Sequence, residues 1–510
     1  MKKIFAKDWL ILQPYAQTDE VDYYYTDLAD KVYNVLLYSQ IANDFPIDAN
    51  MRFTAIALTS WFEDVISQTN IWRTFTAECK KRYGYYLPFF PVEKNYVPDE
   101  INEVDVRYLL WHHLQWYHRN NAIMNPENPA IQVTAKAVYA LFDAEYEHAP
   151  ANDRLKDFIY RPMENGDFQH YRDVLEWFHY HSYFNIENEG AYLAQANLLQ
   201  QDQNIQPGYK QAAAYDVRIQ LLLNGRCDPL SLTSMEWLAL LYADKPELHL
   251  AKNATVEKNH YFLYTSEDDK YIHVDDIFGE ENKELKINKQ SLNEKTLKGR
   301  KPGESLFSCT LVHYGDCCWQ FGMLVVQDAT DELKAQIRQG LDNAEEMKKG
   351  NEKIFHDYLA ATGGKLFTFY KKKEDVEKFF SEKLKYDNKA PELPKEYNEG
   401  CVMFATPEEG LSLQPHIFYC IKSADNPAYD AEKAKKDALA YCVNPQLVPY
   451  PISCILREKG MLPEAMLTSP NGDEYNKEFF KEYGQFITDY FFRRCKEKDF
   501  TDAELLKFLE

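Results

Sequence analysis

The 510-residue sequence has few positive charges for its length. Lys and Arg together number 58, against 80 Asp and Glu, and the formal net charge is −22. A protein that binds a nucleic-acid backbone or an anionic membrane needs a surplus of basic side chains. Here the basic runs are short, as at 371–373, and such runs are typical of solvated surfaces. We therefore expect neither nucleic acid nor a membrane as a partner.

Long hydrophobic runs and paired cysteines are missing as well. No uncharged apolar stretch reaches the ~18 residues of a membrane-spanning helix, and Lys7 and Asp8 interrupt the first segment before it can resemble a secretory signal. The ten cysteines include no CxxC pair, and neighbours such as Cys317 and Cys318 rarely bridge each other without backbone strain. Free thiols are typical of a reducing compartment, so the sequence predicts a cytoplasmic protein.

Common catalytic signatures are also absent. The sequence contains no GxSxG nucleophile elbow, no GxxxxGK[ST] phosphate loop, no HExxH zinc pair and no GxGxxG turn after a strand. Gly363-Gly364-Lys365 precedes an expected strand, which is the context of a helix stop and not of a phosphate loop. Whether the protein is an enzyme, and which cofactor it would use, is left open.

Aromatic residues, in contrast, are abundant. The chain has 37 Tyr and 30 Phe, and hydrophobic residues make up 45% of it, as in an ordinary globular protein. Aromatic side chains bury much area with few rotatable bonds, so we expect large, stiff cores. The alternative use of so many rings is a stacking surface for bases or sugars.

The spacing of apolar residues predicts a helical first half. Tyr25, Leu28, Val32 and Leu36 recur at three- and four-residue steps, which places them on one face of a helix. Further helices are expected over about 102–117, 131–148 and 168–184. Near position 255 the apolar period changes to two, with tight turns between short runs, and this pattern predicts antiparallel strands that close into a small barrel or sandwich.

We accordingly predict an α+β fold in four parts. A helical domain spans 1–252, a small antiparallel β domain spans 253–328, a helical connector spans 329–362, and an α+β domain spans 363–510, becoming α-helical towards its end. Strands are expected at 366–370 and 402–405, each followed by a helix, and the second of these helices carries Ile417, Phe418 and Ile421.

One group of residues has the spacing of a metal site. Glu145 and His148, and likewise Glu176 and His179, are three residues apart on expected helices, so each pair can reach one ion. Ferritin-like di-iron proteins use this spacing on two helices together with single Glu ligands from others, and Glu63 is the natural candidate here. Solvated or hydrogen-bonded side chains are the alternative interpretation of the same residues.

Two further groups contain residue types that occur in reactive sites. His112 and His113 are adjacent on a helix and diverge by about 100°, so packing beside aromatic rings explains them better than a shared ion. Cys318 lies near His313 across an expected turn, but a reactive thiol needs a nearby cation or helix N-terminus. A structural thiol is the simpler interpretation.

Several short strings resemble a family of uncharacterised proteins from gut bacteria of the Bacteroides group. They are Lys7-Asp8-Trp9-Leu10, Pro14-Tyr15, Phe62-Glu63-Asp64-Val65-Ile66-Ser67, Leu87-Pro88-Phe89-Phe90, Asp99-Glu100-Ile101-Asn102, Leu109-Leu110-Trp111, Met403-Phe404-Ala405 and Glu409-Gly410-Leu411. The resemblance spans most of the chain and implies a cytoplasmic bacterial protein. It carries over no catalytic residue, because the family has no assigned activity.

Three functions are consistent with these observations. The first is a non-catalytic binding or adaptor protein with several recognition modules, in which Tyr314, Trp319 and Phe321 line a groove for a protein or peptide partner, unless they form the core of the β domain. The second is a metal-dependent enzyme that uses Glu63 and the two Glu-x-x-His pairs. The third is a hydrolase or transferase whose site is assembled from scattered residues.

Overall fold

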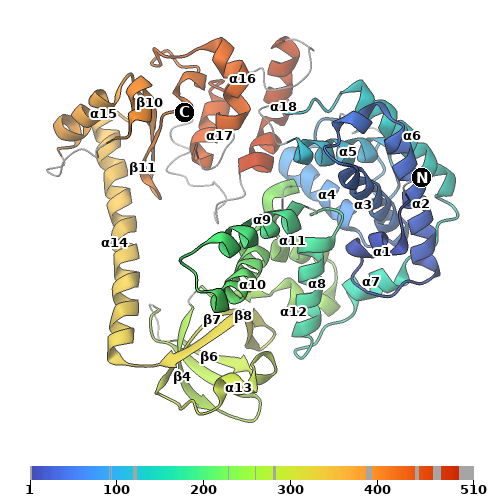
Figure 1. Ribbon diagram of the computed structural model, residues 1–510, viewed down its shortest axis with the longest axis horizontal. Helices are drawn as coiled ribbons and strands as arrows, with labels where there is room; N and C mark the ends of the chain where they lie inside the picture. The colour runs from blue at the N-terminus through green and yellow to red at the C-terminus, as the bar shows by residue number, and fades with distance from the viewer. Residues whose placement is uncertain are drawn as a thin grey trace. The chain divides into compact units, whose positions relative to one another are not determined.

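The computed structural model describes residues 3–90, 92, 95–118, 123–185, 187–227, 229–258, 260–279, 283–385, 393–442, 447–462 and 473–492. The chain forms two compact units (Figure 1). The first unit comprises Met1–Leu87, Val92–Leu110 and Ala130–Arg338, and the second comprises Pro88–Pro91, Trp111–Pro129 and Gln339–Glu510.

The first unit begins with a series of helices, in line with the helical first half that the apolar spacing predicts. They are α1 (Ala6–Trp9), α2 (Glu20–Leu37), α3 (Asp48–Ser67), α4 (Ile71–Tyr83), α5 (Glu103–Tyr117), α6 (Pro129–Glu145), α7 (Asp153–Tyr160), α8 (Phe168–His181), α9 (Glu187–Gln201), α10 (Pro207–Asn224), α11 (Ser234–Leu241) and α12 (His249–Lys252), with a small hairpin of β1 (Arg226–Cys227) and β2 (Leu232–Thr233) before α11. The last residues of α5 belong to the second unit.

Aromatic rings fill the core around α3. Phe62 of α3 stacks on Phe142 of α6 with ring centroids 4.8 Å apart, and Trp61 meets Trp72 of α4 edge-on at 6.1 Å. All four side chains are buried. The expectation of aromatic-rich packing is confirmed here, because interlocked rings give a dense core at a low cost in side-chain entropy.

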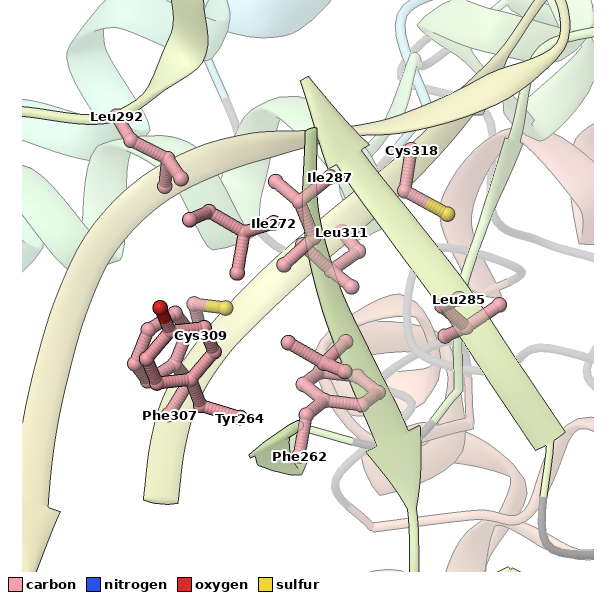
Figure 2. Close-up of a cluster of buried hydrophobic side chains, with 11 residues drawn as sticks. Phe262, Tyr264, Ile272, Leu285, Ile287, Leu292, Phe307, Cys309, Leu311 and Cys318 are labelled. Carbon is pink, nitrogen blue, oxygen red and sulfur yellow. The ribbon is translucent and has the colours of Figure 1, made fainter. Parts of the chain in front are cut away.

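A closed barrel follows the helices, as the change of period predicts. It is built from β4 (Tyr261–Glu267), β5 (Tyr271–Asp276), β6 (Lys283–Asn288), β7 (Ser305–Tyr314) and β8 (Cys317–Asp328), with β3 (Thr255–Val256) on the edge of β7. The strands run in the order β7-β4-β5-β6-β8, and β8 pairs back to β7. Alternate residues of each strand, among them Phe262, Ile272 and Leu311, fill the interior (Figure 2).

The pairing of β6 with β8 gives this barrel its topology. These strands are parallel, with Ile287 opposite Cys318, whereas the other barrel pairs are antiparallel. The short helix α13 (Glu294–Leu297) lies between β6 and β7 in the chain. The OB fold is likewise a small five-stranded Greek-key barrel.

The second unit contains a three-stranded antiparallel sheet in the order β11-β10-β9. Its elements are the greater part of α14 (Asp331–Thr362), then β9 (Phe367–Tyr370), α15 (Lys373–Phe379), β10 (Cys401–Thr406), β11 (Gly410–Gln414), α16 (Ala431–Cys442), α17 (Tyr450–Glu458) and α18 (Asp473–Phe492). Gly363 ends α14, as the sequence predicts, with the Gly364 N–H bonded to the Leu359 carbonyl.

One predicted helix of this unit is wrong. After the turn at 406–410 the chain forms strand β11, which pairs with β10, and the segment that contains Ile417 and Phe418 makes only a short 3₁₀ turn, Phe418–Cys420. Leu411 and Leu413 alternate with polar residues, and this period of two explains the strand. Ile417 and Ile421 are fully buried, so their spacing reflects burial and not a helix face.

The described helices include none with the length and apolar composition needed to cross a membrane.

Candidate functional site

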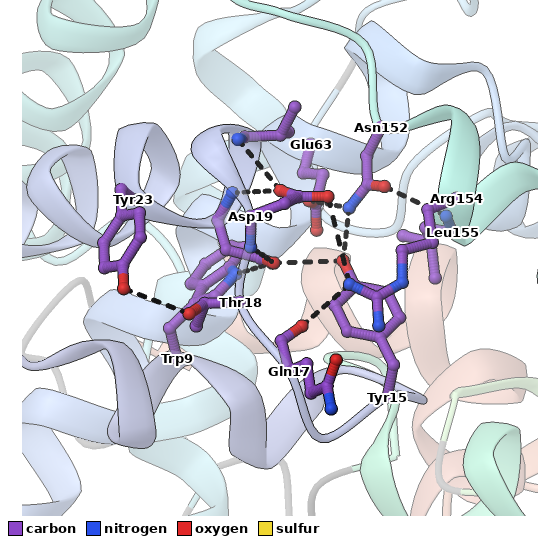
Figure 3. A network of polar contacts seen from close by, with 12 residues as sticks. Trp9, Tyr15, Gln17, Thr18, Asp19, Tyr23, Glu63, Asn152, Arg154 and Leu155 are labelled. Atoms are coloured by element: carbon purple, nitrogen blue, oxygen red, sulfur yellow. Dashed lines mark hydrogen bonds and ion pairs between the residues drawn. The ribbon is translucent and has the colours of Figure 1, made fainter.

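A network of polar contacts in the helical core includes Glu63 of α3 (Figure 3). This side chain is fully buried, and its two carboxylate oxygens accept hydrogen bonds from Gln13 Nε2 and Asn152 Nδ2, each at 2.8 Å. Asn152 Nδ2 also lies 2.6 Å from the hydroxyl of Tyr15, which donates to Asp22 at 3.0 Å. An amide and a phenol therefore connect two acids that are 41 positions apart in the sequence.

Burial favours the protonated, neutral form of the two carboxyl groups in this network. It raises the pKa of Glu63 to about 8, even though the hydrogen bonds from Asn152 and Gln13 favour the ionised form. The pKa of Asp22 is also raised by burial. A carboxyl group with a pKa near neutrality is suited to proton transfer, but Glu63 has no exposed surface through which a substrate could touch it. In this conformation the network is a structural one, which joins the segment before α2 to α3 and α7.

Asp64, the next residue, joins α3 to α4 and to the segment that follows α8. Its carboxylate accepts the backbone N–H groups of Ile71 and Trp72 at 3.1 and 2.8 Å, so it satisfies the first turn of α4. It also accepts from the hydroxyls of Thr69 and, at 2.6 Å, Tyr183. Four donors compensate the burial of this acid. Two adjacent acids in an apolar helix are thus explained by their partners.

The predicted metal ligands of α6 have other partners. Glu145 accepts hydrogen bonds from Lys31 Nζ at 2.8 Å and from the hydroxyl of Tyr24 at 2.9 Å, and these bonds lower its pKa. The expected helix over 131–148 ends at Glu145, because the chain turns before Pro150, and His148 lies exposed beyond that end. The two residues therefore do not share a helix face.

The predicted ligands of α8 are also engaged separately. Glu176 lies 3.5 Å from the guanidinium of Arg172. His179 is buried, its Nδ1 lies 2.7 Å from Ser234 Oγ, and burial lowers its pKa to about 3.

Within the described ranges, no three His, Cys, Asp or Glu side chains are grouped in a way that could hold a metal ion. The geometry gives no support to a shared ion at the five predicted ligands, Glu63, Glu145, His148, Glu176 and His179. The metal site stays a prediction, and elemental analysis of the purified protein tests it directly.

His112 and His113 lie in the second unit, where both are buried. The rings are nearly perpendicular, at 88°, with centroids 5.8 Å apart. His112 Nδ1 lies 2.7 Å from the Tyr490 hydroxyl, and burial holds the pKa of His113 well below its ordinary value. These contacts agree with packing beside aromatic rings.

Cys318 and His313 form a hydrogen-bonded chain with a carboxylate that the sequence did not indicate. They are directly opposite on β8 and β7, with Sγ 3.3 Å from Nδ1. His313 Nε2 lies 2.8 Å from Glu257, which also accepts from Lys283 at 2.8 Å. A neutral imidazole with its proton on Nε2 satisfies both bonds, so the thiol donates to Nδ1.

The burial of the Cys318 thiol distinguishes this hydrogen-bonded chain from a catalytic triad. A nucleophile, a base and an orienting acid are all in place. However, the thiol of Cys318 belongs to the barrel core and is only 1% exposed, and burial raises its pKa to about 12. The thiolate needed for catalysis is therefore strongly disfavoured. All eight cysteines whose side chains are described are free thiols, as the sequence predicts.

The three aromatic residues expected to line a peptide groove are buried. Trp319 stacks on Phe168 of α8 with centroids 4.9 Å apart, Phe321 meets the same ring edge-on, and Tyr314 stacks on Tyr171 at 5.4 Å. They fasten the barrel to α8. Their period of two correctly predicts a strand, but that period cannot show which surface the outer side chains will meet.

The outward side chains of β5 and β6 form a different surface, here called the β5–β6 face. Its members are three cross-strand pairs: Tyr271 with Asn288, His273 with Lys286, and Asp275 with Glu284. They alternate with buried residues and are half-buried or exposed. The alternation alone indicates outward positions in the sequence, but only the closed barrel shows that the two strands are neighbours on one face.

Two turns frame the β5–β6 face. His273 Nε2 lies 3.0 Å from Asp268 in the turn between β4 and β5. Lys286 Nζ lies 3.0 Å from Asp316 in the turn between β7 and β8, and 4.9 Å from the centre of the Tyr271 ring. In OB folds the face of the second and third strands, with these same two turns, binds oligonucleotides or oligosaccharides.

Comparison with known families finds a match that covers residues 3–301 and 324–493. The matching family is described as protein of unknown function (DUF3843). No curated protein and no solved structure matches the chain. Because the matched segments make up most of the sequence, the chain belongs to the DUF3843 family of proteins of unknown function.

Proposed function

We propose that this protein is a non-catalytic binding protein and that its β5–β6 face takes a neutral oligosaccharide. The observation that carries the proposal is the placement of an aromatic ring, an amide, an imidazole and two carboxylates on the second and third strands of an OB-type barrel. The barrel topology supports the location of the site by analogy of fold. The ligand class is argued from the residues themselves.

Charge disfavours an oligonucleotide on this face. Residues 267–289 contain eight Asp and Glu against four Lys. Three of the lysines are already paired with acids: Lys283 with Glu257, Lys286 with Asp316, and Lys289 with Glu267 at 2.7 Å. A phosphate backbone is bound by releasing counterions onto free cations. A paired lysine on an acidic surface provides little of that driving force.

The same groups suit a sugar. Tyr271 supplies an apolar ring with a polar end, which can stack on the flat face of a pyranose. Asp275 and Glu284 are directly opposite each other, an arrangement of like charges that destabilises a sheet, and Glu284 also lies 3.3 Å from Nδ1 of His273. Carboxylates accept hydrogen bonds strongly, so donors from ligand hydroxyls between them would offset the repulsion.

The test is a glycan array with the full chain, followed by calorimetric titration of the neutral oligosaccharides that bind. We expect Tyr271→Ala to weaken binding about tenfold or more, which corresponds to roughly 1.4 kcal/mol. Because the ligand is uncharged, raising NaCl from about 50 to about 500 mM should change the affinity less than about twofold. The matched control is Tyr209→Ala, which removes an exposed ring from α10.

Three results would contradict the proposal. They are the failure of all neutral glycans to bind, equal effects of the Tyr271 and Tyr209 substitutions, and tighter binding of oligo(dT) with a steep salt dependence. A protein or peptide partner is the competing form of a binding function, and it would appear as a stoichiometric partner in a pull-down that Tyr271→Ala leaves unchanged.

A further inference from the structure

The second unit contains a small cavity of its own, unrelated to the β5–β6 face. Its volume is about 210 Å³, and its walls come from the start of β9, the loop after Ile421, and the end of α17. A cavity of about 150 Å³ is enough to hold benzene. This cavity therefore has room for a molecule with a single ring and one small substituent.

One wall of the cavity is aromatic. Phe367 and Phe369 are alternate residues of β9, so they project from the same face of the sheet. Their rings meet edge-on with centroids 5.9 Å apart. Thr368, between them, bonds on the opposite face to the hydroxyl of Tyr358 from α14. The ring pair is thus held in place by a sheet that is packed on its other side.

Another part of the lining is fixed by backbone hydrogen bonds. Met461, which lines the cavity, donates its N–H to the Leu456 carbonyl at 2.8 Å and accepts from the Lys422 N–H at 2.9 Å. These bonds join the end of α17 to the loop that follows Ile421. They also satisfy a terminal carbonyl of α17, which would otherwise repel an anion.

The charged side chains of the cavity leave one cation unpaired. Lys365 Nζ lies 2.7 Å from Asp425, and this pair is neutral as a unit. Lys459 makes no ion pair with any residue that the structure describes. Ser423 accepts from the Asp425 N–H at 3.3 Å, which leaves its own hydroxyl proton for a ligand. The polar side of the cavity thus offers a positive charge and a hydroxyl donor.

We propose that this cavity binds a small one-ring carboxylate. The ring lies against Phe367 and Phe369, and the carboxylate accepts from Lys459 and from the hydroxyl of Ser423. Charge-assisted bonds of this kind are about twice as strong as neutral ones. The proposal is independent of the function of the barrel, because it uses only residues of the second unit.

The experiment is an NMR-monitored titration of the full chain with benzoate and with benzamide, its uncharged analogue. We expect saturable binding of benzoate and at least about fivefold weaker binding of benzamide. Lys459→Gln should weaken benzoate binding about fivefold and leave benzamide unchanged, whereas Asp425→Asn should strengthen benzoate binding because it frees Lys365. The matched control is Lys348→Gln, at an exposed position of α14.

Each other outcome would overturn the proposal. Equal binding of benzoate and benzamide would show that the negative charge of the ligand does not contribute to binding. Equal effects of the Lys459 and Lys348 substitutions would show that benzoate does not bind at this cavity. The lack of saturable benzoate binding would remove the cavity as a ligand site. Lys459 is exposed, so its substitution is compatible with folding, and a thermal unfolding curve for each variant checks that the comparison is between folded proteins.

Discussion

At the scale of single residues, Glu63 poses a problem of proton placement. A carboxyl group with a pKa of about 8 is protonated at neutral pH and must donate its proton to an acceptor. Both of its oxygens face amide N–H groups, while the Oε1 atom of Gln13 is buried with no hydrogen-bond partner among the described residues. Rotation of the Gln13 amide by 180° would present Oε1 to the acid. We expect this orientation in the neutral state.

The protonation of Glu63 gives a first prediction: the free energy of unfolding depends on pH, and Glu63→Gln removes this contribution. The pKa of Glu63 is higher in the folded chain, at about 8, than its ordinary value of 4.5, so the folded state binds more protons between these values. The free energy of unfolding should therefore fall as the pH rises from about 4.5 to about 8, by up to ~1.4 kcal/mol per pH unit from this group. The Gln side chain of Glu63→Gln does not titrate, so this variant lacks the contribution.

Urea denaturation at several pH values measures this effect. The difference in stability between the natural chain and Glu63→Gln should change across that window and become constant above it. Glu147→Gln, at an exposed position, is the control and should follow the natural chain. A difference that is the same at all pH values would show that Glu63 is ionised in the folded protein.

The second residue-scale prediction concerns the Cys318 thiol. Because burial raises its pKa to about 12, we expect iodoacetamide at mildly alkaline pH to modify Cys318 at least about a hundredfold more slowly in the folded protein than in urea. Peptide mass spectrometry measures the rate for each cysteine, and the less buried Cys454 provides the internal comparison. Faster modification in the folded state would reveal a thiolate held by His313, as a cysteine hydrolase requires.

At the scale of elements, the packing of α10 on the barrel depends on one glycine. Gly322 lies in β8 where the pairing with β7 skips from Phe321 to Leu324, a β-bulge, and its φ is +82°. A Cβ atom there would lie 3.0 Å from Cγ2 of Ile219 on α10. At the end of α14, Gly363 also has a positive φ, +73°, but its Cβ would meet nothing within 4 Å.

These two glycines form a matched pair of substitutions. Gly363→Ala should cost about 1 kcal/mol, the conformational cost of a left-handed Ala. Gly322→Ala should cost at least about 1 kcal/mol more, because Ile219 is fully buried and has little room to move. Chemical denaturation measures both. Equal costs would mean that α10 and the barrel are not in close contact in solution.

The elements also show which predictions a local pattern can support. The period of two between 261 and 326 correctly predicts antiparallel strands, because alternation is a property of one strand. The parallel pairing of Ile287 with Cys318 is not predictable in this way, since it joins strands separated by a helix and another strand. Ile417 and Ile421 are four residues apart, as on one helix face, but both are buried in a segment that forms only a short 3₁₀ turn. Their spacing therefore led to the wrong prediction of a helix.

At the scale of the whole molecule, the second unit depends on two early segments of the chain. Phe89 stacks on Phe479 of α18 with centroids 5.4 Å apart, and Trp111 contacts Tyr490 at the same distance. Phe89 holds a φ of +74°, which is unfavourable for a bulky residue, so its packing must offset that cost. This packing gives a structural role to Leu87-Pro88-Phe89-Phe90, one of the short strings on which the family resemblance rests.

The whole-molecule prediction is that residues 339–510 do not fold alone. Without Phe89 and Trp111 the core of this unit has a cavity where two large rings should lie, and such losses cost roughly 3–5 kcal/mol each. We expect the isolated fragment to lack a cooperative thermal transition, and Phe89→Ala in the full chain to destabilise it by about 3 kcal/mol or more. A fragment that unfolds cooperatively would refute this account.

The sequence by itself determined the local features of this protein: the helical first half, the change to strands near position 255, the helix stop at Gly363, and the low content of positive charge. These follow from the geometry of a few consecutive residues. Only the tertiary structure decided that Gln13, Glu63 and Asn152 meet, that Tyr314 and Trp319 face α8, and that Cys318 points into a core. Such outcomes depend on burial and on partners far away in the chain, so short-range patterns carry no information about them.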